Sequence, residues 1–235
     1  MLEPEALSIE AARVREVYAR RKGGARYSFA EPAHMLSVQE RESRLLAMLA
    51  NRGYDSLATT RILEVGCGTG YWLRRFVEWG ANPENILGID VLAERIEGAR
   101  NSCPVGIRLM CQNAAEIPVP DSGFDLVLQS TVFTSILDSQ IRKLVAREML
   151  RALSPNGLIL WYDFCVDNLF NADVRGVSRT EISHLFPDCR IELERLTLAP
   201  PLGRPIARIS PPMYRMLSRA HMLCSHYLGT ISRAK

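Results

Sequence analysis

The chain has 235 residues, of which 47% are hydrophobic and 23% are charged, and its formal net charge at pH 7 is +3. This length and composition are typical of one globular domain that buries a core without disulfides or metals. No apolar run approaches the roughly 18 residues of a membrane span, and the charged N-terminus lacks the apolar core of a secretion signal, so we expect a cytoplasmic protein.

The N-terminal region is predicted to be helical. Apolar residues recur at helical spacing over residues 3–22. After a looser glycine-containing stretch, Ser37 and Glu40 form a capping-box pattern for a second helix that reaches about Asn51. We therefore expect residues 1–57 to form a helical cap that precedes the first strand.

From residue 61 onward, strand-like and helix-like segments alternate. Strand patterns occupy 61–65, 85–90, 107–112, 124–129 and 158–164, and helix patterns occupy 71–80, 92–100 and 137–153. The sequence SPNG is read as a turn before the fifth strand. Alternation at this spacing indicates parallel β-α-β units and a doubly wound sheet.

The last third of the chain is less regular. It shows a helix pattern at 180–186, a strand pattern at 190–198 and a closing strand pattern at 226–232. Five prolines between 200 and 212 are expected to break the chain before an amphipathic stretch at 213–224. That stretch could pack as a lid helix, line an acceptor pocket or touch a membrane surface.

These patterns together predict the fold class. We expect an α/β protein with a doubly wound, mainly parallel sheet of seven strands, in a single domain. Besides the N-terminal cap, that domain would contain a core that binds a cofactor, at 58–165, and a part for the substrate or lid, with the closing strands, at 166–235.

The sequence ILEVGCGTGYW carries the strongest functional signal. Gly66, Gly68 and Gly70 let the backbone turn tightly at the end of a strand and approach a ligand closely. The GxGxG spacing differs from the GxGxxG of a dinucleotide site, since Tyr71 stands at the third glycine position, and no Lys-Ser/Thr follows as in a phosphate-binding loop. Topology places Asp90, at the end of the next strand, beside this loop, where its carboxylate can accept both ribose hydroxyls of a cofactor.

With Glu64 ahead of the glycines, this segment resembles the class I S-adenosylmethionine-dependent methyltransferase family over roughly Arg61 to Phe164. The resemblance implies that S-adenosylmethionine is the cofactor, that the glycine loop faces its amino-acid part and that Asp90 holds its ribose. In the family, Glu64 would orient the loop and the cofactor's amino group; a purely structural role in the loop is the alternative.

The resemblance assigns further contacts to the cofactor. Asn113 and Ala114 would meet the adenine, with Asn113 standing where the family more often has Asp; its amide oxygen can accept the same hydrogen bond. Val91 and Leu92 would lie against the adenine face, and Gln129 near the methionine portion. The predicted cofactor-binding residues are Tyr27, Glu64, Gly66, Cys67, Gly68, Gly70, Asp90, Val91, Asn113, Ala114 and Gln129.

The methyl acceptor is less well indicated. Over nearly its whole length the chain is similar to bacterial small-molecule methyltransferases, through the segments RYS, TVFTSILD, WYDF, DVRG, TLAPPL and HYLG. Leu128-Gln129-Ser130-Thr131 stands where amine and amide methyltransferases carry Asn/Asp-Pro-Pro-aromatic, which disfavours DNA and glutamine as acceptors. We expect methyl transfer to an oxygen, or less favourably a carbon, of a small metabolite or glycan precursor. The alternatives are an RNA or protein methyltransferase and a non-catalytic protein that binds S-adenosylmethionine.

Two residues are candidates for a general base. Asp163 ends the fifth strand, at the sheet edge where open α/β folds bind ligands, although a cap or loop hydrogen bond is the plainer role. His184 lies in the helix at 180–186 and competes with a packing or surface role. His226 is placed in an expected edge strand and given a structural role.

Charge and cysteine usage bear on partners. From Val174 onward there are ten Lys/Arg against four Asp/Glu, a balance that favours an anionic substrate, a membrane surface or nucleic acid, or forms a solvated face. Nucleic acid is not expected, because no aromatic residues interleave the basic ones. The six cysteines show no metal-ligand spacing, so we expect no metal site and free, mostly buried thiols. A homodimer is left open.

Overall fold

The computed structural model describes residues 4–20, 30–168 and 171–234. Its seven strands form one sheet in the order β3-β2-β1-β4-β5-β7-β6. The strands are β1 (Ile62–Val65), β2 (Ile86–Asp90), β3 (Arg108–Cys111), β4 (Phe124–Ser130), β5 (Leu153–Phe164), β6 (Cys189–Leu198) and β7 (Cys224–Arg233). Only β7 runs antiparallel to its neighbours, β5 and β6. The predicted α/β fold with a mainly parallel seven-stranded sheet is confirmed.

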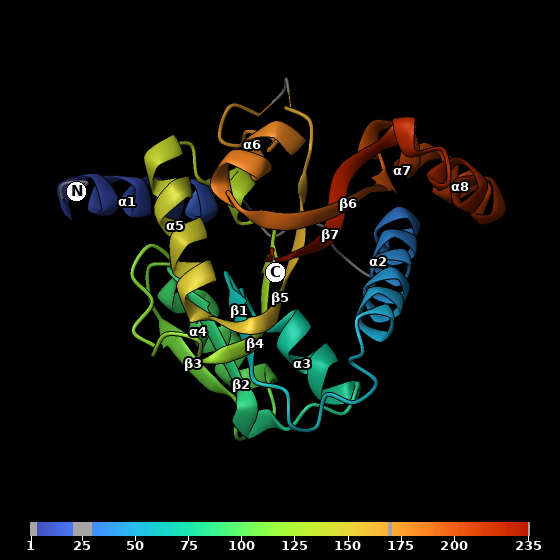
Figure 1. The fold of residues 1–235 in the computed structure, drawn as a ribbon. Coiled ribbons are helices and arrows are strands. Elements are labelled where there is room, and N and C mark those ends of the chain that lie inside the picture. The colour runs from blue at the N-terminus through green and yellow to red at the C-terminus, as the bar shows by residue number, and fades with distance from the viewer. Residues whose placement is uncertain (1–3, 21–29, 169–170, 235) are drawn as a thin grey trace.

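Helices cover both faces of this sheet (Figure 1). They are α1 (Pro4–Arg20), α2 (Pro32–Asn51), α3 (Tyr71–Glu78), α4 (Ala93–Ser102), α5 (Ser139–Ala152), α6 (Arg179–Leu185), α7 (Pro200–Ile209) and α8 (Pro211–Ser218), with short 3-10 turns η2 (Pro83–Asn85), η3 (Phe133–Ser135) and η4 (His221–Leu223). None of the described helices is both long and apolar enough to cross a bilayer.

The core is divided by the sheet into two layers. In β1, Leu63 packs in the layer that holds the buried faces of α5 and α6, and its neighbour Ile62 packs in the layer that holds α2 and α3. Because successive strand residues point to opposite faces and both faces are covered, a central strand is apolar throughout. The run ILEV follows this pattern, and its four residues are all buried. Glu64 differs from the other three residues because it is buried although its side chain is polar.

The loop between β1 and α3 depends on its glycines. Gly66, Gly68 and Gly70 have φ values of 70°, 54° and 79°, in the left-handed region that glycine enters without a steric penalty. Gly70 is the N-cap of α3, and a Cβ there would lie 2.2 Å from Sγ of Cys103. The loop therefore needs glycine for its conformation and, at Gly70, also for space.

Proline positions account for two wrong predictions. Helix α2 begins at Pro32 with Glu31 as its N-cap, so Ser37 is not a cap but lies inside the helix. The prolines after β6 do not break the chain, because α7 and α8 each begin with a pair of them. Proline fits the first helical turn, where its missing N–H has no intrahelical partner to lose. A third proline, Pro205, is accommodated inside α7.

Three further predictions from the sequence are wrong. The predicted SPNG turn lies within β5, where the pairing with β4 shifts register. His226 is not in an edge strand, because β7 lies between β5 and β6 and the edge strand is β6. The six cysteines are free, but Cys67 and Cys224 are the two that are buried, so the thiols are not mostly buried.

We predict that Gly70→Ala destabilises the fold more than Gly53→Ala. Both positions have φ near 80°, and forcing alanine into this region costs about 1–2 kcal/mol. A Cβ at Gly53 would meet nothing within 4 Å, whereas at Gly70 it would overlap Cys103, and overpacking adds about 1–3 kcal/mol. Urea unfolding of the two variants measures the difference in the free energy of unfolding; equal losses would contradict the packing argument.

Candidate functional site

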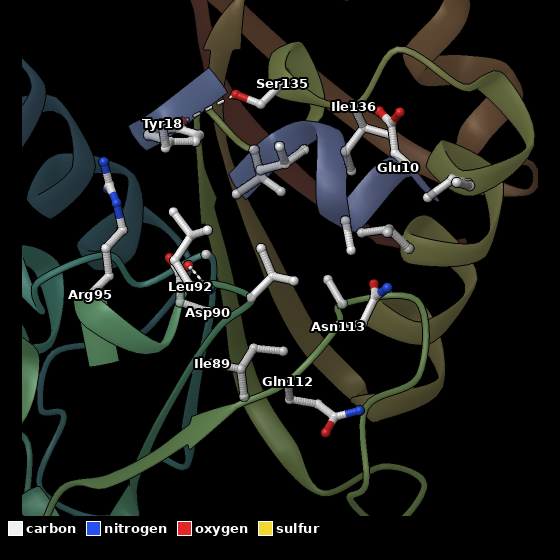
Figure 2. Close-up of a pocket in the computed structure, with 18 of the residues that line it drawn as sticks. Glu10, Tyr18, Ile89, Asp90, Leu92, Arg95, Gln112, Asn113, Ser135 and Ile136 are labelled. Atoms are coloured by element: carbon white, nitrogen blue, oxygen red, sulfur yellow. Dashed lines mark hydrogen bonds between the residues drawn. The ribbon is translucent and has the colours of Figure 1, made fainter. Parts of the chain in front are cut away.

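A cavity lies at the carboxyl ends of the central parallel strands, with α1 along one side (Figure 2). The chain leaves β1, β2, β3 and β4 at this edge, so loops far apart in sequence meet there. The lining residues from these loops and from η3 are Gly66, Asp90, Val91, Leu92, Gln112, Asn113, Ala114, Ser130, Thr131, Val132, Ser135 and Ile136. Helices α1 and α5 add Leu7, Glu10, Ala11, Val14, Tyr18, Ile141 and Val145.

Asp90 is a carboxyl group of this cavity that is held at both of its oxygens. Its Oδ2 accepts the N–H of Gly68 at 2.9 Å, and its Oδ1 accepts the N–H of Leu92 at 2.9 Å. Burial raises the pKa of this carboxyl, and the two N–H groups oppose the rise. Since a carboxylate oxygen has two lone pairs, each oxygen can accept one more hydrogen bond from a ligand.

Two buried polar side chains lie on the neighbouring strands β1 and β4. Glu64 and Gln129 are 2% and 0% exposed, respectively. Gln129 Oε1 accepts the N–H of Val132 at 3.1 Å, but its Nε2 and Oε2 of Glu64 have no hydrogen-bond partner among the described residues. Burial, and then the negative charge of Asp90, raise the pKa of Glu64 well above its ordinary value. A buried carboxylate oxygen and amide N–H left unmatched are unusual and call for a ligand or a solvent partner.

The four residues that the resemblance assigns to the adenine lie close together in the structure. Val91, Leu92, Asn113 and Ala114 all line the cavity, and Figure 2 shows Leu92 and Asn113 on the two loops that border it. Asn113 Oδ1 accepts the N–H of Ala115 at 3.0 Å, which fixes the orientation of its amide. The structure thus gathers three apolar side chains and one oriented amide in the same cavity as Asp90.

Other residues predicted to bind the cofactor do not line the cavity themselves. Gly68 reaches the site through its N–H to Asp90, and Gly70 caps α3. The side chain of Cys67 is buried in the core layer of α2 and α3, and its N–H donates to the carbonyl oxygen of Ile89 at 2.8 Å. Neither Cys67 nor the last two glycines line the cavity. Tyr27 lies outside the described residues.

Neither base candidate lines the cavity. Asp163 is fully buried at the end of β5, where it accepts the N–H groups of Thr134 at 3.2 Å and Phe164 at 2.9 Å. Thr134 belongs to η3, so this carboxylate lies one layer behind the cavity wall. Burial raises the pKa of Asp163 to about 7, and the N–H groups it binds oppose the rise. His184 is exposed on α6.

The loop after β4 forms a wall of the cavity and approaches the glycine loop closely, with Val132 next to Gly66. Thr131 has φ 59°, a strained backbone for a β-branched residue. Its N–H donates to the carbonyl oxygen of Tyr162 at 2.8 Å. The buried Arg142 donates from Nε to the carbonyl oxygen of Ile136 at 2.7 Å and from Nη1 to Glu181 at 2.7 Å. The loop is therefore held from β5 and α5.

Helix α1 is the part of the site that the sequence did not indicate. Glu10 Oε1 accepts the N–H of Leu137 at 2.7 Å, and Arg13 donates both to Glu10 and to the carbonyl oxygen of Ser135. The Tyr18 hydroxyl lies 3.3 Å from Ser135 Oγ. Burial opposes ionisation of Glu10, but Arg13 and the N–H of Leu137 outweigh it and hold its pKa below the ordinary value. Helical periodicity predicts an apolar face for this segment, but not that it covers a cavity.

Comparison with known proteins identifies a methyltransferase domain in this chain. Residues 62–157 match a family model described as a methyltransferase domain. A tRNA N(3)-cytidine methyltransferase from Gallus gallus is 27% identical over 46% of this chain and 31% of its own length. A demethylmenaquinone methyltransferase from Listeria welshimeri is 28% identical over 60% of this chain and 61% of its own length. The chain thus spans from under a third to about three fifths of these relatives.

Solved structures show the same fold. An S-adenosylmethionine-dependent methyltransferase from Clostridium acetobutylicum superimposes with a TM-score of 0.62 at 12% identity, covering 84% of this chain and 92% of its own. One from Mesorhizobium loti gives 0.58 at 20% identity, covering 81% and 96%. The resemblance inferred from the glycine loop is confirmed: residues 62–157 match a methyltransferase domain, and the chain has the fold of solved S-adenosylmethionine-dependent methyltransferases.

Proposed function

We propose that this protein transfers the methyl group of S-adenosylmethionine to an oxygen, or less favourably a carbon, of a small metabolite or glycan precursor. The observation that carries the proposal is the oriented carboxylate of Asp90, set beside a glycine loop in a cavity at the carboxyl edge of the sheet. We further propose that residues 1–235 act as one unit, because α1 supplies part of the cavity wall.

The residues of the cavity fit the cofactor. Asp90 would accept both ribose hydroxyls, and the side chains of Val91 and Leu92, with Asn113 and Ala114, would take the adenine. Gly66 allows close approach to the wall formed by the loop after β4, since a Cβ there would lie 2.4 Å from Cγ2 of Val132. When bound, the cofactor supplies an electrophilic methyl group on a sulfonium.

The unmatched atoms of Glu64 and Gln129 support the methionine end of this proposal. A carboxylate is favoured near a cationic sulfonium and ammonium, and an amide N–H near a carboxylate. Both side chains are buried on adjoining strands directly before the loops that line the cavity. Positive charge from a ligand would offset the burial that raises the pKa of Glu64.

Positioning, rather than a strong base, would supply the acceleration. In-line transfer needs the acceptor held near the methyl carbon with water excluded. The two carboxylates in the described cavity wall, Glu10 and Asp90, are each held by backbone N–H groups. Asp163 and His184 lie outside that wall, so we propose that Asp163 acts by holding η3 in place.

The proposed acceptor rests on Leu128-Gln129-Ser130-Thr131, which stand where amine and amide methyltransferases carry Asn/Asp-Pro-Pro-aromatic. Names of relatives point in several directions, since they include enzymes for tRNA, for malonyl-[acyl-carrier protein] and for demethylmenaquinone. The alternatives to this proposal are an RNA or protein methyltransferase and a non-catalytic protein that binds S-adenosylmethionine.

We predict that Asp90→Asn weakens binding of S-adenosylmethionine by at least about tenfold, because hydrogen bonds to a charged group contribute about 1.5–3 kcal/mol each. Isothermal titration calorimetry gives the dissociation constant, and Asp90→Ala should bind more weakly still. The exposed Asp55 provides a matched control, with Asp55→Asn binding like the wild type. If Asp90→Ala binds like the wild type, the proposed cofactor site is wrong.

We predict that incubation of the protein with methyl-labelled S-adenosylmethionine and a bacterial cell extract labels a low-molecular-weight compound. Asp90→Ala should give no label in the same extract. Label found only in RNA or protein would replace the small-molecule proposal with the macromolecular alternative. Tight cofactor binding without label in any fraction would favour the non-catalytic alternative.

We predict that Asp163 makes the wild-type fold less stable as the pH rises. Its pKa is about 7 in the folded state and about 3.9 in an unfolded chain, so the folded state retains the proton between these values. Stability is full below about pH 4 and falls until about pH 7, by on the order of 4 kcal/mol at most. Relative to Asp163→Asn, the wild type should therefore lose stability across this window in urea unfolding.

Asp125 gives the matched control for this experiment. Its hydrogen bond with Arg61 lowers the pKa of Asp125, so its stabilising effect is lost only as the pH falls below about 4. The stability difference between Asp125→Asn and the wild type should be constant from about pH 5 to 8. A constant difference for Asp163→Asn as well would contradict the buried, protonated state of Asp163.

A further inference from the structure

The connection between β6 and β7 is far longer than the geometry of the sheet requires. Antiparallel neighbours are usually joined by two to five residues. Here residues 199–223 intervene and form α7, α8 and η4. Because β6 runs parallel to the central strands, this connection leaves the sheet at its carboxyl edge, the edge that carries the cavity. Figure 1 shows α7 and α8 at the periphery, on the opposite side of the molecule from α1.

The inner side of this connection is packed and fixed. Ala207 and Tyr214 are buried in a small core cluster with Ala33, Leu36 and Leu198. Helices α7 and α8 contact each other, and both contact α2. The connection is thus a built surface with a defined orientation.

The outer side exposes large apolar side chains. Ile209 is 80% exposed, Met216 63% and Met222 90%, and Leu202 and Met213 are exposed to a smaller extent. These are five of the nine exposed large hydrophobic residues of the described chain, in about a tenth of its length. Such a concentration on α7, α8 and η4 indicates a contact surface.

The charged residues of the connection between β6 and β7 are all arginines. Residues 199–224 contain Arg204, Arg208, Arg215 and Arg219 and no Asp or Glu. Arg208 pairs with Glu31 of α2 at 2.6 Å. Arg215 and Arg219 are exposed, and among the described residues neither has an ion-pair partner within 4 Å. The surface therefore presents cationic and apolar groups together.

We infer that α7, α8 and η4 dock the protein on an anionic lipid surface. Apolar side chains that enter the headgroup boundary, next to arginines that attract anionic lipids, are the combination that binds helices at a membrane interface. RNA fits less well, because the aromatic residue of the segment, Tyr214, is 2% exposed and cannot stack on bases. A second copy of the chain fits less well too, because pairing this surface with itself would bring arginines of the two copies together, and like charges repel.

The test is sedimentation of the full chain with lipid vesicles. The protein should bind vesicles that contain phosphatidylglycerol more tightly than pure phosphatidylcholine vesicles, and added salt should weaken this binding. Each arginine near a membrane contributes about fivefold to partitioning, so Arg215→Gln/Arg219→Gln should lower it by about 25-fold. Met216→Gln/Met222→Gln should also lower it, at all salt concentrations.

Lys143→Gln/Arg147→Gln is the matched control, because both residues are exposed on α5 and the net charge changes equally. Its vesicle binding should stay within about twofold of the wild type, since binding depends on charge near the lipid. Equal weakening by the control would reduce the effect to net charge and overturn the proposal. Equal binding of the protein to anionic and neutral vesicles would also overturn the proposal. So would tight binding of the protein to tRNA alone, if tRNA also releases the protein from the vesicles. Thermal unfolding confirms that each variant is folded.

Discussion

The site depends on one arrangement, in which the carboxylate of Asp90 binds the N–H groups of Gly68 and Leu92. These two hydrogen bonds join the loop after β1 to the loop after β2 at the edge where both strands end. The glycine loop can reach Asp90 because its three glycines adopt left-handed backbone angles. The same two hydrogen bonds oppose the rise in the pKa of Asp90 that burial causes.

The polar interior around this contact costs stability that an apolar core would not. Glu64, Gln129 and Asp163 are almost fully buried, and burial raises the pKa of both carboxyls. Asp163 is satisfied by backbone N–H groups, whereas Glu64 and Gln129 each keep an unmatched atom within the described structure. Folded proteins tolerate such groups mainly at functional sites, and each of these is the last residue but one of its strand, behind the cavity wall rather than in it.

The sequence predicted the core of the fold well because its signals there are local. Periodic apolar runs, a glycine turn and an acid at a strand end identify β1, α3 and β2 without knowledge of distant residues. The failures have a different cause. Pro200 and Pro201 break a helix in its interior but start one in its first turn, and neighbouring residues do not tell the two apart. The docking of α1 depends on Glu10 and Leu137, 127 positions apart, a contact that no periodicity encodes.

Different loops at the carboxyl edge of the sheet have different proposed roles. The loops after β1, β2 and β3 carry the groups suited to the cofactor, and they are fixed by short backbone contacts. The loop after β4 is held instead by Asp163 at the end of β5 and by Arg142, which also binds Glu181 of α6. We therefore expect a change of acceptor to require changes in β5, α5 and α6 as well as in the cavity wall. The connection after β6 leaves the same edge and carries the surface proposed to bind lipid. The cofactor groups and the lipid-binding surface therefore lie at different places along one edge of the sheet.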